Sequence, residues 1–457
     1  MSLTKICCRF GSVTRKHVLL ILSLVVFCGQ YGASSAFAAS AQVVPIKWSA
    51  FKAEQPIDQL GATYQSILLN TSKYAMTTWW QVRGYAAQKG QYLDFFGTDE
   101  NNLRPAADEA FALAVSIKTG VYDSKKIGVT TVVSKQRLNK LISSLAFRHR
   151  AVSKNGWGNS WQSALWASKA GWAAWLTWDS LSLQDKKNVQ AMVEYEANRF
   201  NTYPPPYYRD PNGKINYPGD TKAEENAWNA GVLQLATAMM PNHPNFNIWH
   251  GKMLQLMISS FARPLDLKSR EIVDGKMLSS WLRGSNIDND GTLTNRGRMH
   301  PDYMTTITLN IQAALMYSLA QLPVPRATFY NADIIYKALS DGKFYGSHIY
   351  NNGSGSISYP RGTALGLKRR MNFALLDIEA KIFGFDNLAT KKGDYWASLH
   401  AFLVNTMQLR SGDGRTYLTA REDKYPGREE WVAEAAAQAY LAKWLQAWGG
   451  LKTYNQK

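Results

Sequence analysis

AWNAGVLQLATAMM (residues 227–240) is apolar on almost every side when it is wound into a helix. A second run, ITLNIQAALMYSLA (residues 307–320), has the same character. A helix that is hydrophobic all round belongs in the interior of a large protein, whereas a surface helix keeps one solvated face. The two runs therefore predict a helical fold with an inner layer of fully buried helices.

Helical periodicity recurs along the rest of the chain, and some segments, such as 182–200 with Asp185 and Glu194, have the polar face of an outer helix. Short breaks alternate with longer connections, as in repeated helical hairpins. We expect an all-α fold, an α/α toroid of roughly five to six hairpins, formed by residues 39–457 as a single domain. The predicted helices are 57–75, 104–119, 132–149, 160–178, 182–200, 220–240, 243–261, 301–321, 326–341, 368–384, 389–411 and 427–447.

Three long connections interrupt this pattern. Residues 201–219 are rich in proline, tyrosine and glycine, residues 262–300 contain short strand-like pieces, and residues 342–363 are typical of a β-hairpin or flap. Long loops on a rigid scaffold often carry function, so we expect them near the site.

The first 38 residues have the features of a secretory signal. Basic residues precede the apolar run 18–28, and Ala36-Phe37-Ala38 offers a cleavage site. The run is too short to span a membrane. We therefore expect an exported protein, periplasmic or extracellular, that begins after Ala38.

Cysteine content and charge limit the kinds of site and ligand that the chain can have. All three cysteines, Cys7, Cys8 and Cys28, lie in the expected signal, so the rest of the chain forms no disulfide or thiolate metal site. The chain carries 52 basic and 34 acidic side chains. Such a balance favours polyanions, and for an exported protein these are acidic polysaccharides rather than nucleic acid. A basic protein without any charged ligand is the alternative.

Polar residues gather where the first apolar helix begins, in GDTKAEENAWNAG (residues 219–231). Thr221 and Glu224 have the spacing of a capping box, which explains their presence at a helix start. Glu225, Asn226 and Asn229 are not explained in this way, and the apolar face marked by Trp228 directs Glu225 and Asn229 inward. We interpret these three as one wall of an active cleft.

A second polar cluster precedes the other apolar helix, in DGTLTNRGRMHPDYM (residues 290–304). Its candidate site residues are Arg296, Arg298, His300, Asp302 and Tyr303. If both inner helices run the same way, the two polar ends share one rim, and the helix N-termini add a positive field suited to a carboxylate. This cluster is the predicted opposite wall.

Further substrate-binding candidates lie in loops. Tyr359 and Arg361 belong to the predicted flap, and Trp157, Tyr207 and Tyr208 offer rings on which sugars stack. No nucleotide loop, zinc motif or nucleophile elbow is present, and we expect no metal or cofactor.

The segment DGTLTNRGRMHPDYM before an apolar helix resembles the corresponding segment of heparinase II/III-type polysaccharide lyases, and ENAWNAGVLQLA is similar to their asparagine-bearing inner helix. Some alginate lyases likewise consist of the toroid alone. The resemblance implies β-elimination on a uronate polymer, with Asn226, Tyr303 and His300 in the positions of the family's asparagine, tyrosine and histidine.

Two other functions remain open. Glycoside hydrolysis needs two carboxylates, for which Glu224 or Glu225 would serve as the acid and Asp302 or Asp220 as the base. A non-catalytic glycan-binding protein of the envelope would use the same aromatic and charged residues without releasing a product.

Overall fold

The computed structural model describes residues 43–457 except 53, 361–365, 420–421, 423–427 and 455–457. The expected signal sequence and Arg361 lie outside the described residues. Contacts group residues 41–457 as one compact unit. Within the described residues, no helix combines the length and the apolar character that crossing a membrane requires.

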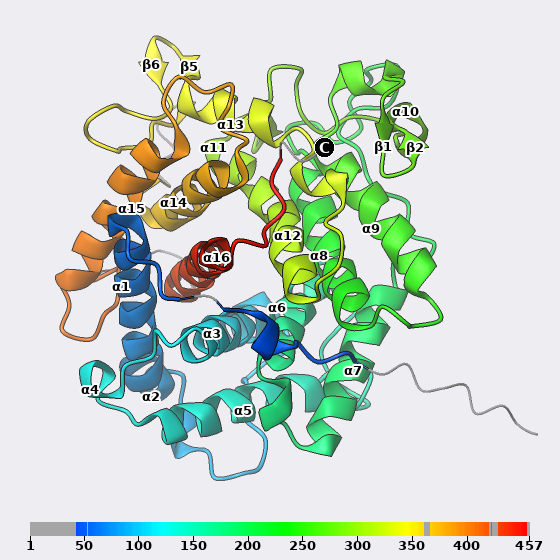
Figure 1. Cartoon of the computed structure of the whole chain (residues 1–457). Helices are drawn as coiled ribbons and strands as arrows, with labels where there is room; N and C mark the ends of the chain where they lie inside the picture. The colour runs from blue at the N-terminus through cyan, green and yellow to red at the C-terminus, as the bar shows by residue number, and fades with distance from the viewer. Residues whose placement is uncertain (1–42, 53, 361–365, 420–421, 423–427, 455–457) are drawn as a thin grey trace, which may run out of the picture. The chain divides into compact units, whose positions relative to one another are not determined.

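The described chain is mostly helical, which confirms the predicted all-α class (Figure 1). Each of the predicted helical segments contains a helix, and the boundaries differ by a few residues. The long helices are α1 (Gln59–Tyr74), α3 (Glu100–Lys118), α5 (Thr131–Phe147), α6 (Ser163–Leu176), α7 (Leu183–Asn198), α8 (Ala223–Met239), α9 (Phe246–Ser260), α12 (Thr308–Leu319), α13 (Ala332–Ser340), α14 (Gly366–Phe383), α15 (Gly393–Leu409) and α16 (Arg428–Trp448).

One predicted helix, 301–321, is broken. It consists of the short helix α11 (Pro301–Met304), the 3-10 turn η6 (Thr305–Ile307) and α12. The hydroxyls of Thr305 and Thr306 donate to the carbonyls of Asp302 and Tyr303, at 2.7 and 2.6 Å. Such local side-chain bonds compete with regular helix geometry and account for the tight turn.

The connections contain short helices and three two-stranded antiparallel sheets in the described residues. The remaining short α-helices are α2 (Trp80–Val82), α4 (Ser124–Ile127) and α10 (Leu278–Trp281). The strand pairs are β1 (Ile272–Val273) with β2 (Lys276–Met277), β3 (Thr294–Asn295) with β4 (Arg298–Met299), and β5 (Lys343–Phe344) with β6 (Ser347–His348). The last pair is the predicted flap hairpin, with Tyr345 and Gly346 at positive φ in its two-residue turn.

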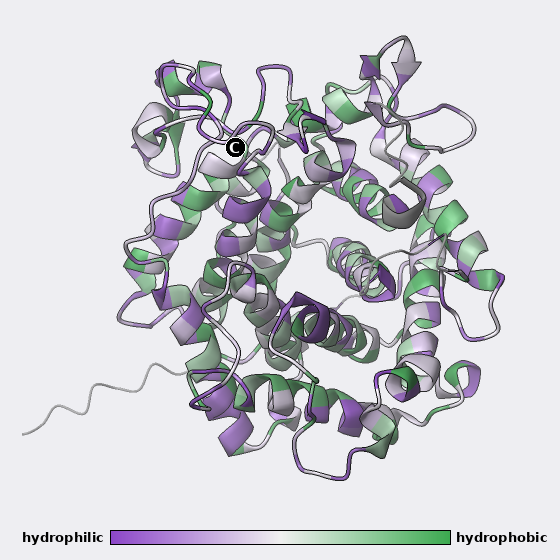
Figure 2. Ribbon diagram, turned by 180° about the vertical axis from the view of Figure 1, so that it is seen from behind, coloured by the Kyte–Doolittle hydropathy of each residue, from purple (hydrophilic) through white to green (hydrophobic). Residues whose placement is uncertain are grey.

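The helices fall into two groups by their contacts. The core helices, α3, α6, α8, α12, α14 and α16, pack on one another in that succession, and α16 also packs on α3. Helices α1, α5, α7, α9, α13 and α15 each pack against the outside of one or more of them (Figure 1). Hydrophilic and hydrophobic residues alternate along these outer helices (Figure 2), as expected for amphipathic helices that cover a core.

Burial confirms that the two apolar runs form inner helices. Every residue of α8 except Glu225 and every residue of α12 except Leu309 is buried, and α6 in the same inner group is buried throughout. Gly171 and Gly231 lie where core helices approach each other closely. A Cβ at Gly171 would lie 2.7 Å from Leu235 Cδ2 on α8.

The first described residues cover the C-terminal ends of the core helices. The Val44 amide donates to the Met239 carbonyl at the end of α8, and the Trp175 indole donates to the Val44 carbonyl, both at 2.8 Å. Farther along, Phe51 packs against Trp448 with ring centroids 4.6 Å apart. We call residues 43–51 the N-terminal segment.

Candidate active site

A cavity of about 270 Å³ lies at the N-terminal ends of the core helices. Each core helix contributes a residue from its first turns or middle: Asp108 from α3, Lys169 from α6, Glu224 from α8, Thr308 from α12, Leu375 from α14 and Glu434 from α16. The core helices therefore run in one direction and direct their N-termini toward a single space. Because a helix N-terminus carries a partial positive charge, their combined field favours anionic groups there.

Asp108 is a buried carboxyl in the cavity wall with a raised pKa. It is 3% exposed, and its Oδ2 lies 3.5 Å from Nε of Arg104. Burial raises the pKa of Asp108 well above its usual range, and the Glu434 charge adds to this, while Arg104 and Lys169 oppose it. Asp108 therefore retains a proton at pH values where an ordinary aspartate has lost it.

Glu434 lies in a different environment, because it forms an ion pair with the buried ammonium of Lys169. Lys169 also donates to Gln312 Oε1 at 2.9 Å, and Gln312 donates in turn to Gln234 Oε1 at 3.0 Å. This chain of polar side chains crosses from α6 through α12 to α8. It fixes the position of the Lys169–Glu434 pair in the cavity wall.

Aromatic rings lie among these charges. The guanidinium carbons of Arg104 and Arg428 lie 4.1 and 4.3 Å from the ring centroid of Trp431, and all three residues line the cavity. Trp228 and the largely exposed Trp161 line it as well. The cavity thus combines charged groups with flat apolar surfaces, which is the composition of a site for a polar ligand with apolar faces.

Of the predicted second cluster, Tyr303 and Arg296 line the cavity, whereas His300 and Asp302 lie behind it. His300 is 1% exposed, with its ring 4.7 Å from Tyr303 and 6.2 Å from Tyr359 between centroids. The Tyr359 hydroxyl donates to Asp302. His300, Asp302 and Tyr303, which are close in sequence, therefore also lie together in the structure, beside Tyr359.

Arg298 lies in strand β4, opposite Asn295 of β3. It is not among the cavity residues. The isolated bridge between Asp220 and Asn295 joins this hairpin to the start of α8, so the two predicted walls do adjoin.

The predicted first wall needs correction at its most important residue. Glu225 is not a cavity residue and pairs with Lys222 at 2.9 Å, while Glu224, interpreted as a helix cap, lines the cavity. Lys222, rather than Thr221, is the N-cap residue, and the Thr221 hydroxyl donates to the Asn286 carbonyl at 2.7 Å. Thr221 Oγ accepts from the Ala223 amide at 3.2 Å, and Glu224 is a cavity residue.

Asn226 and Asn229 are both buried, as inward-facing residues should be, but neither is a cavity residue. The Asn226 amide donates to the Pro206 carbonyl at 2.9 Å and so holds the 201–219 loop against α8. This contact favours a structural role for Asn226.

The loop aromatics predicted to bind sugar lie in the core. Trp157 is 2% exposed, and its indole donates to the Leu145 carbonyl at 2.9 Å. The Tyr207 hydroxyl bonds Ser259 Oγ at 2.6 Å, and the Tyr208 amide donates to Asn286 at 2.7 Å. Because their rings are buried, these residues present no open face to a ligand.

Sequence reasoning missed Asp108, Lys169 and Glu434. A signal was present, because Asp108 and Glu109 interrupt the apolar stretch AADEAFALAV (residues 106–115) as conspicuously as Glu224 and Glu225 interrupt theirs. Arg104 lies four residues before Asp108, which is the spacing of an ion pair on one helix face.

A larger cavity, about 530 Å³, lies elsewhere, near the loop after α12 and the C-terminal residues 452–454. Two of its cations form ion pairs with carboxylates of the same cavity, Arg263 with Asp266 at 2.8 Å and Arg326 with Glu271 at 2.6 Å. The smaller cavity is the better candidate active site, because it contains a desolvated carboxyl with a raised pKa.

Among the described side chains, no group of three or more histidine, cysteine, aspartate or glutamate residues is arranged to hold a metal ion. Comparisons with protein-family models, with curated proteins and with solved structures gave no significant match. The functional assignment therefore depends on the chemistry of the cavity.

Proposed function

We propose that the protein is an exported carbohydrate-active enzyme that cleaves glycosidic bonds in the cavity at the N-terminal ends of the core helices. The observation that supports this is the contrast between its two carboxyls. Asp108 is desolvated and has a raised pKa, whereas Glu434 is paired with Lys169. Two carboxyls with contrasting environments are what acid–base cleavage of a glycosidic bond requires.

We further propose that the scaffold is an α/α toroid. The succession of contacts from α3 through α16 and back to α3, with an outer helix against each core helix, supports this arrangement. In such a scaffold the residues at one end of the inner helices meet at a common centre. Export is proposed from the signal-like residues 1–38.

In the proposed hydrolysis, Asp108 donates its proton to the leaving glycosidic oxygen as the C1–O bond breaks. Glu434 accepts a proton from a water molecule, whose oxygen forms the new bond to C1. The products are two shorter sugars, one with a new reducing end, and proton transfer through the solvent restores both carboxyls. The Lys169 ammonium holds the carboxylate of Glu434 in position through their ion pair.

β-Elimination on a uronate polymer is the second candidate, because Tyr303 and Arg296 line the same cavity. In this reaction Arg296 neutralises the uronate carboxylate, and Tyr303 removes the C5 proton and returns a proton to the leaving oxygen. The electron pair of the C5–H bond forms the C4–C5 double bond as the C4–O bond breaks. Hydrolysis has the stronger support, because His300 and Asn226 are buried away from the cavity.

Product chemistry separates these functions. The purified protein is incubated with a panel of neutral and uronate-containing polysaccharides, while reducing ends and the ultraviolet absorbance of unsaturated uronates are followed. Reducing ends without absorbance support hydrolysis, and both signals together support elimination. Binding without either product supports the non-catalytic glycan-binding alternative and contradicts the proposed function.

The Asp108→Asn variant tests the residue assignment on whichever substrate is cleaved. We expect turnover to fall roughly 100- to 10,000-fold, the usual range for loss of a general acid. Glu109→Gln is the matched control, because Glu109 is the next residue of α3, equally buried, and outside the cavity wall. Equal turnover in Asp108→Asn and the wild type would exclude Asp108 as the acid.

A further inference from the structure

Trp161 has an unusual position at the cavity. It is 59% exposed, and among the described residues it is the only tryptophan with more than a third of its surface open. It nevertheless lines the cavity and contacts the edge of Trp228, with ring centroids 5.2 Å apart. Single exposed apolar residues are common, so exposure alone indicates nothing. The way in which the preceding loop is held makes this residue informative.

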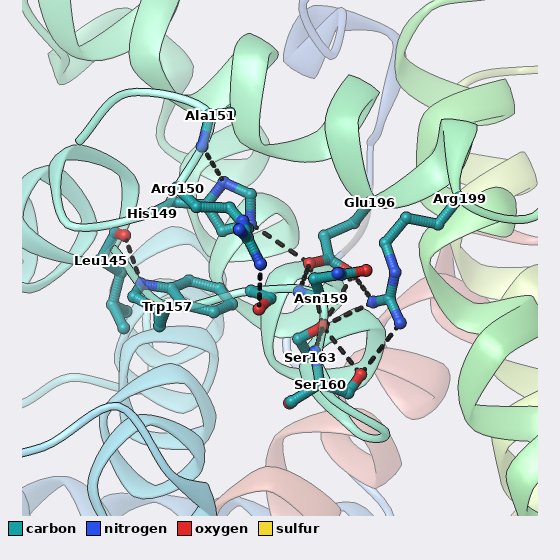
Figure 3. Close-up of polar contacts among 11 residues, drawn as sticks. Leu145, His149, Arg150, Ala151, Trp157, Asn159, Ser160, Ser163, Glu196 and Arg199 are labelled. Atoms are coloured by element: carbon teal, nitrogen blue, oxygen red, sulfur yellow. Dashed lines mark hydrogen bonds and ion pairs between the residues drawn. The ribbon is translucent and has the colours of Figure 1, made fainter. Parts of the chain in front are cut away.

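A buried cluster fixes the backbone immediately before Trp161 (Figure 3). Glu196 of α7 accepts hydrogen bonds from the Asn159 amide at 3.0 Å and from Ser163 Oγ at 2.9 Å. Arg199 pairs with Glu196 and donates to the Ser160 carbonyl at 3.0 Å. The residues on both sides of Trp161 are thus tied to α7.

His149 completes this cluster without making it a catalytic triad. The Ala151 amide donates to Nδ1 of His149 at 3.2 Å, so the hydrogen on Nε2 faces Glu196 at 3.3 Å. Ser163 contacts Glu196 and Arg199 rather than His149, and His149, Ser163 and Glu196 are all buried. This geometry presents no nucleophile to a ligand. The role of the cluster is to position the loop that carries Trp161.

The electrostatics of the cluster favour a fixed charge. Burial raises the pKa of Glu196, but the hydrogen bond from His149 and the charge of Arg199 outweigh it, so the pKa is lowered overall. Burial lowers the pKa of His149. Glu196 therefore remains a carboxylate paired with Arg199, beside a neutral histidine.

The loop backbone is also held in a conformation that few residues adopt. Asn159 has a φ of 59°, and a Cβ at Gly158 would lie 2.6 Å from Nε2 of His149. Such a conformation persists only where the surroundings determine it. The cluster therefore holds the most exposed tryptophan of the described chain in one place, at the rim of the cavity.

We propose that Trp161 is the platform of a sugar-binding subsite, on which the apolar face of a glycan ring stacks as the chain enters the cavity. In this proposal Glu196 is a positioning residue that acts through Asn159 and Ser163. The proposal depends on the proposed function for the class of ligand, a glycan. It does not require that the glycan be cleaved.

Binding of defined oligosaccharides tests the subsite. Cellotetraose, chitotetraose, tetragalacturonate and tetramannuronate are titrated into the full-length protein by calorimetry, and quenching of tryptophan fluorescence by acrylamide is measured with and without each sugar. We expect one of them to protect a fluorescence component that is missing from Trp161→Phe. Trp161→Ala should bind this sugar about tenfold more weakly, while Trp161→Phe retains most of the affinity.

The role of Glu196 is tested by a double-mutant cycle for binding. Glu196→Gln, or the milder Ser163→Ala if the first does not fold, should weaken binding in the wild-type background but cause no further loss in Trp161→Ala. Equal losses in both backgrounds would overturn the positioning role. Failure of all four sugars to bind the wild type, or unchanged affinity in Trp161→Ala, would overturn the subsite. Binding that depends on Trp161 without any cleavage would contradict the proposed function alone.

Discussion

The two ends of the core helices differ in composition although the same helices form both. At the N-terminal end, Asp108, Lys169 and Glu434 line a cavity. At the C-terminal end, the N-terminal segment packs Trp48 and Phe51 against Trp444, with centroids 6.2 and 6.1 Å apart. These three aromatic rings also line a cavity of about 490 Å³. The comparison shows aromatic contacts at one end of the core helices and a buried carboxyl and ammonium at the other.

The largest expected effect comes from breaking the ion pair at the cavity. Glu434→Gln should lower turnover roughly 100- to 10,000-fold, because it removes the proposed base and leaves the ammonium of buried Lys169 without its counter-charge. Asp58→Asn is the matched control, because it breaks a Lys–carboxylate pair, Lys443 to Asp58 at 2.7 Å, nearer the other end of α16. Steady-state kinetics measure turnover in both variants. Equal losses of turnover would contradict the assignment of catalysis to the N-terminal end of the core helices.

Stability should respond most strongly at the opposite end. Trp444→Ala removes a large buried ring that contacts both Trp48 and Phe51, and we expect the free energy of unfolding to fall by about 3–5 kcal/mol. Denaturant unfolding measures this loss. Turnover of the folded variant at 25 °C should match the wild type, and a loss of activity as large as that of Glu434→Gln would contradict the comparison.

These expectations depend on residues that the sequence revealed only in part. The inner helices were predictable because an apolar run has no solvated face, and α8 and α12 are buried almost throughout. Which of two adjacent acids faces inward was not predictable. Glu224 lies four residues before Trp228 and Glu225 three, and both spacings share a helix face. Glu225 forms a local ion pair with Lys222, three residues earlier in the chain, and the apolar periodicity alone does not indicate which acid it selects.

The same reason explains why the loop aromatics were misjudged. A tryptophan-rich stretch gives no indication of which ring remains exposed. Trp157 is buried and Trp161 is exposed because the His149–Glu196 cluster folds the intervening loop onto α7, and its members are up to 50 residues apart in the chain. The second polar cluster was easier to recognise, because Tyr303, His300 and Arg296 are close in sequence.

The pH dependence of stability should be a gradual effect, spread over several pH units. Glu109 is 1% exposed, and burial together with Glu430 and Glu429 raises its pKa well above the ordinary 4.5. The folded state keeps this proton at pH values where the unfolded state has lost it. Stability therefore falls as the pH rises above about 4.5, by up to about 1.4 kcal/mol per pH unit, until the folded pKa is reached.

Glu109→Gln tests this dependence, because the amide cannot titrate. Thermal unfolding should show the variant more stable than the wild type at pH 8 and similar to it near pH 4. Parallel pH profiles for the two proteins would mean that Glu109 does not hold its proton in the folded state.

The smallest effect is expected at Glu225. Its ion pair with Lys222 is partly exposed to solvent, and such pairs contribute about 1 kcal/mol or less. Glu225→Gln should therefore keep turnover and change the midpoint of thermal unfolding by only a few degrees. Loss of turnover in this variant would indicate instead that Glu225 takes part in the reaction, as the sequence predicted.

The N-terminal segment also bears on how the molecule reaches its final form. The Trp448 indole donates to the Ala50 carbonyl, a contact between residues 398 positions apart. Contacts that span so much of the chain are slow to form, because the intervening segment must first be ordered. The N-terminal segment therefore completes its contacts only when α16 has docked. Until α16 docks, Trp48 and Phe51 have no partner at 444 or 448, and the partly folded chain exposes an aromatic surface that favours aggregation.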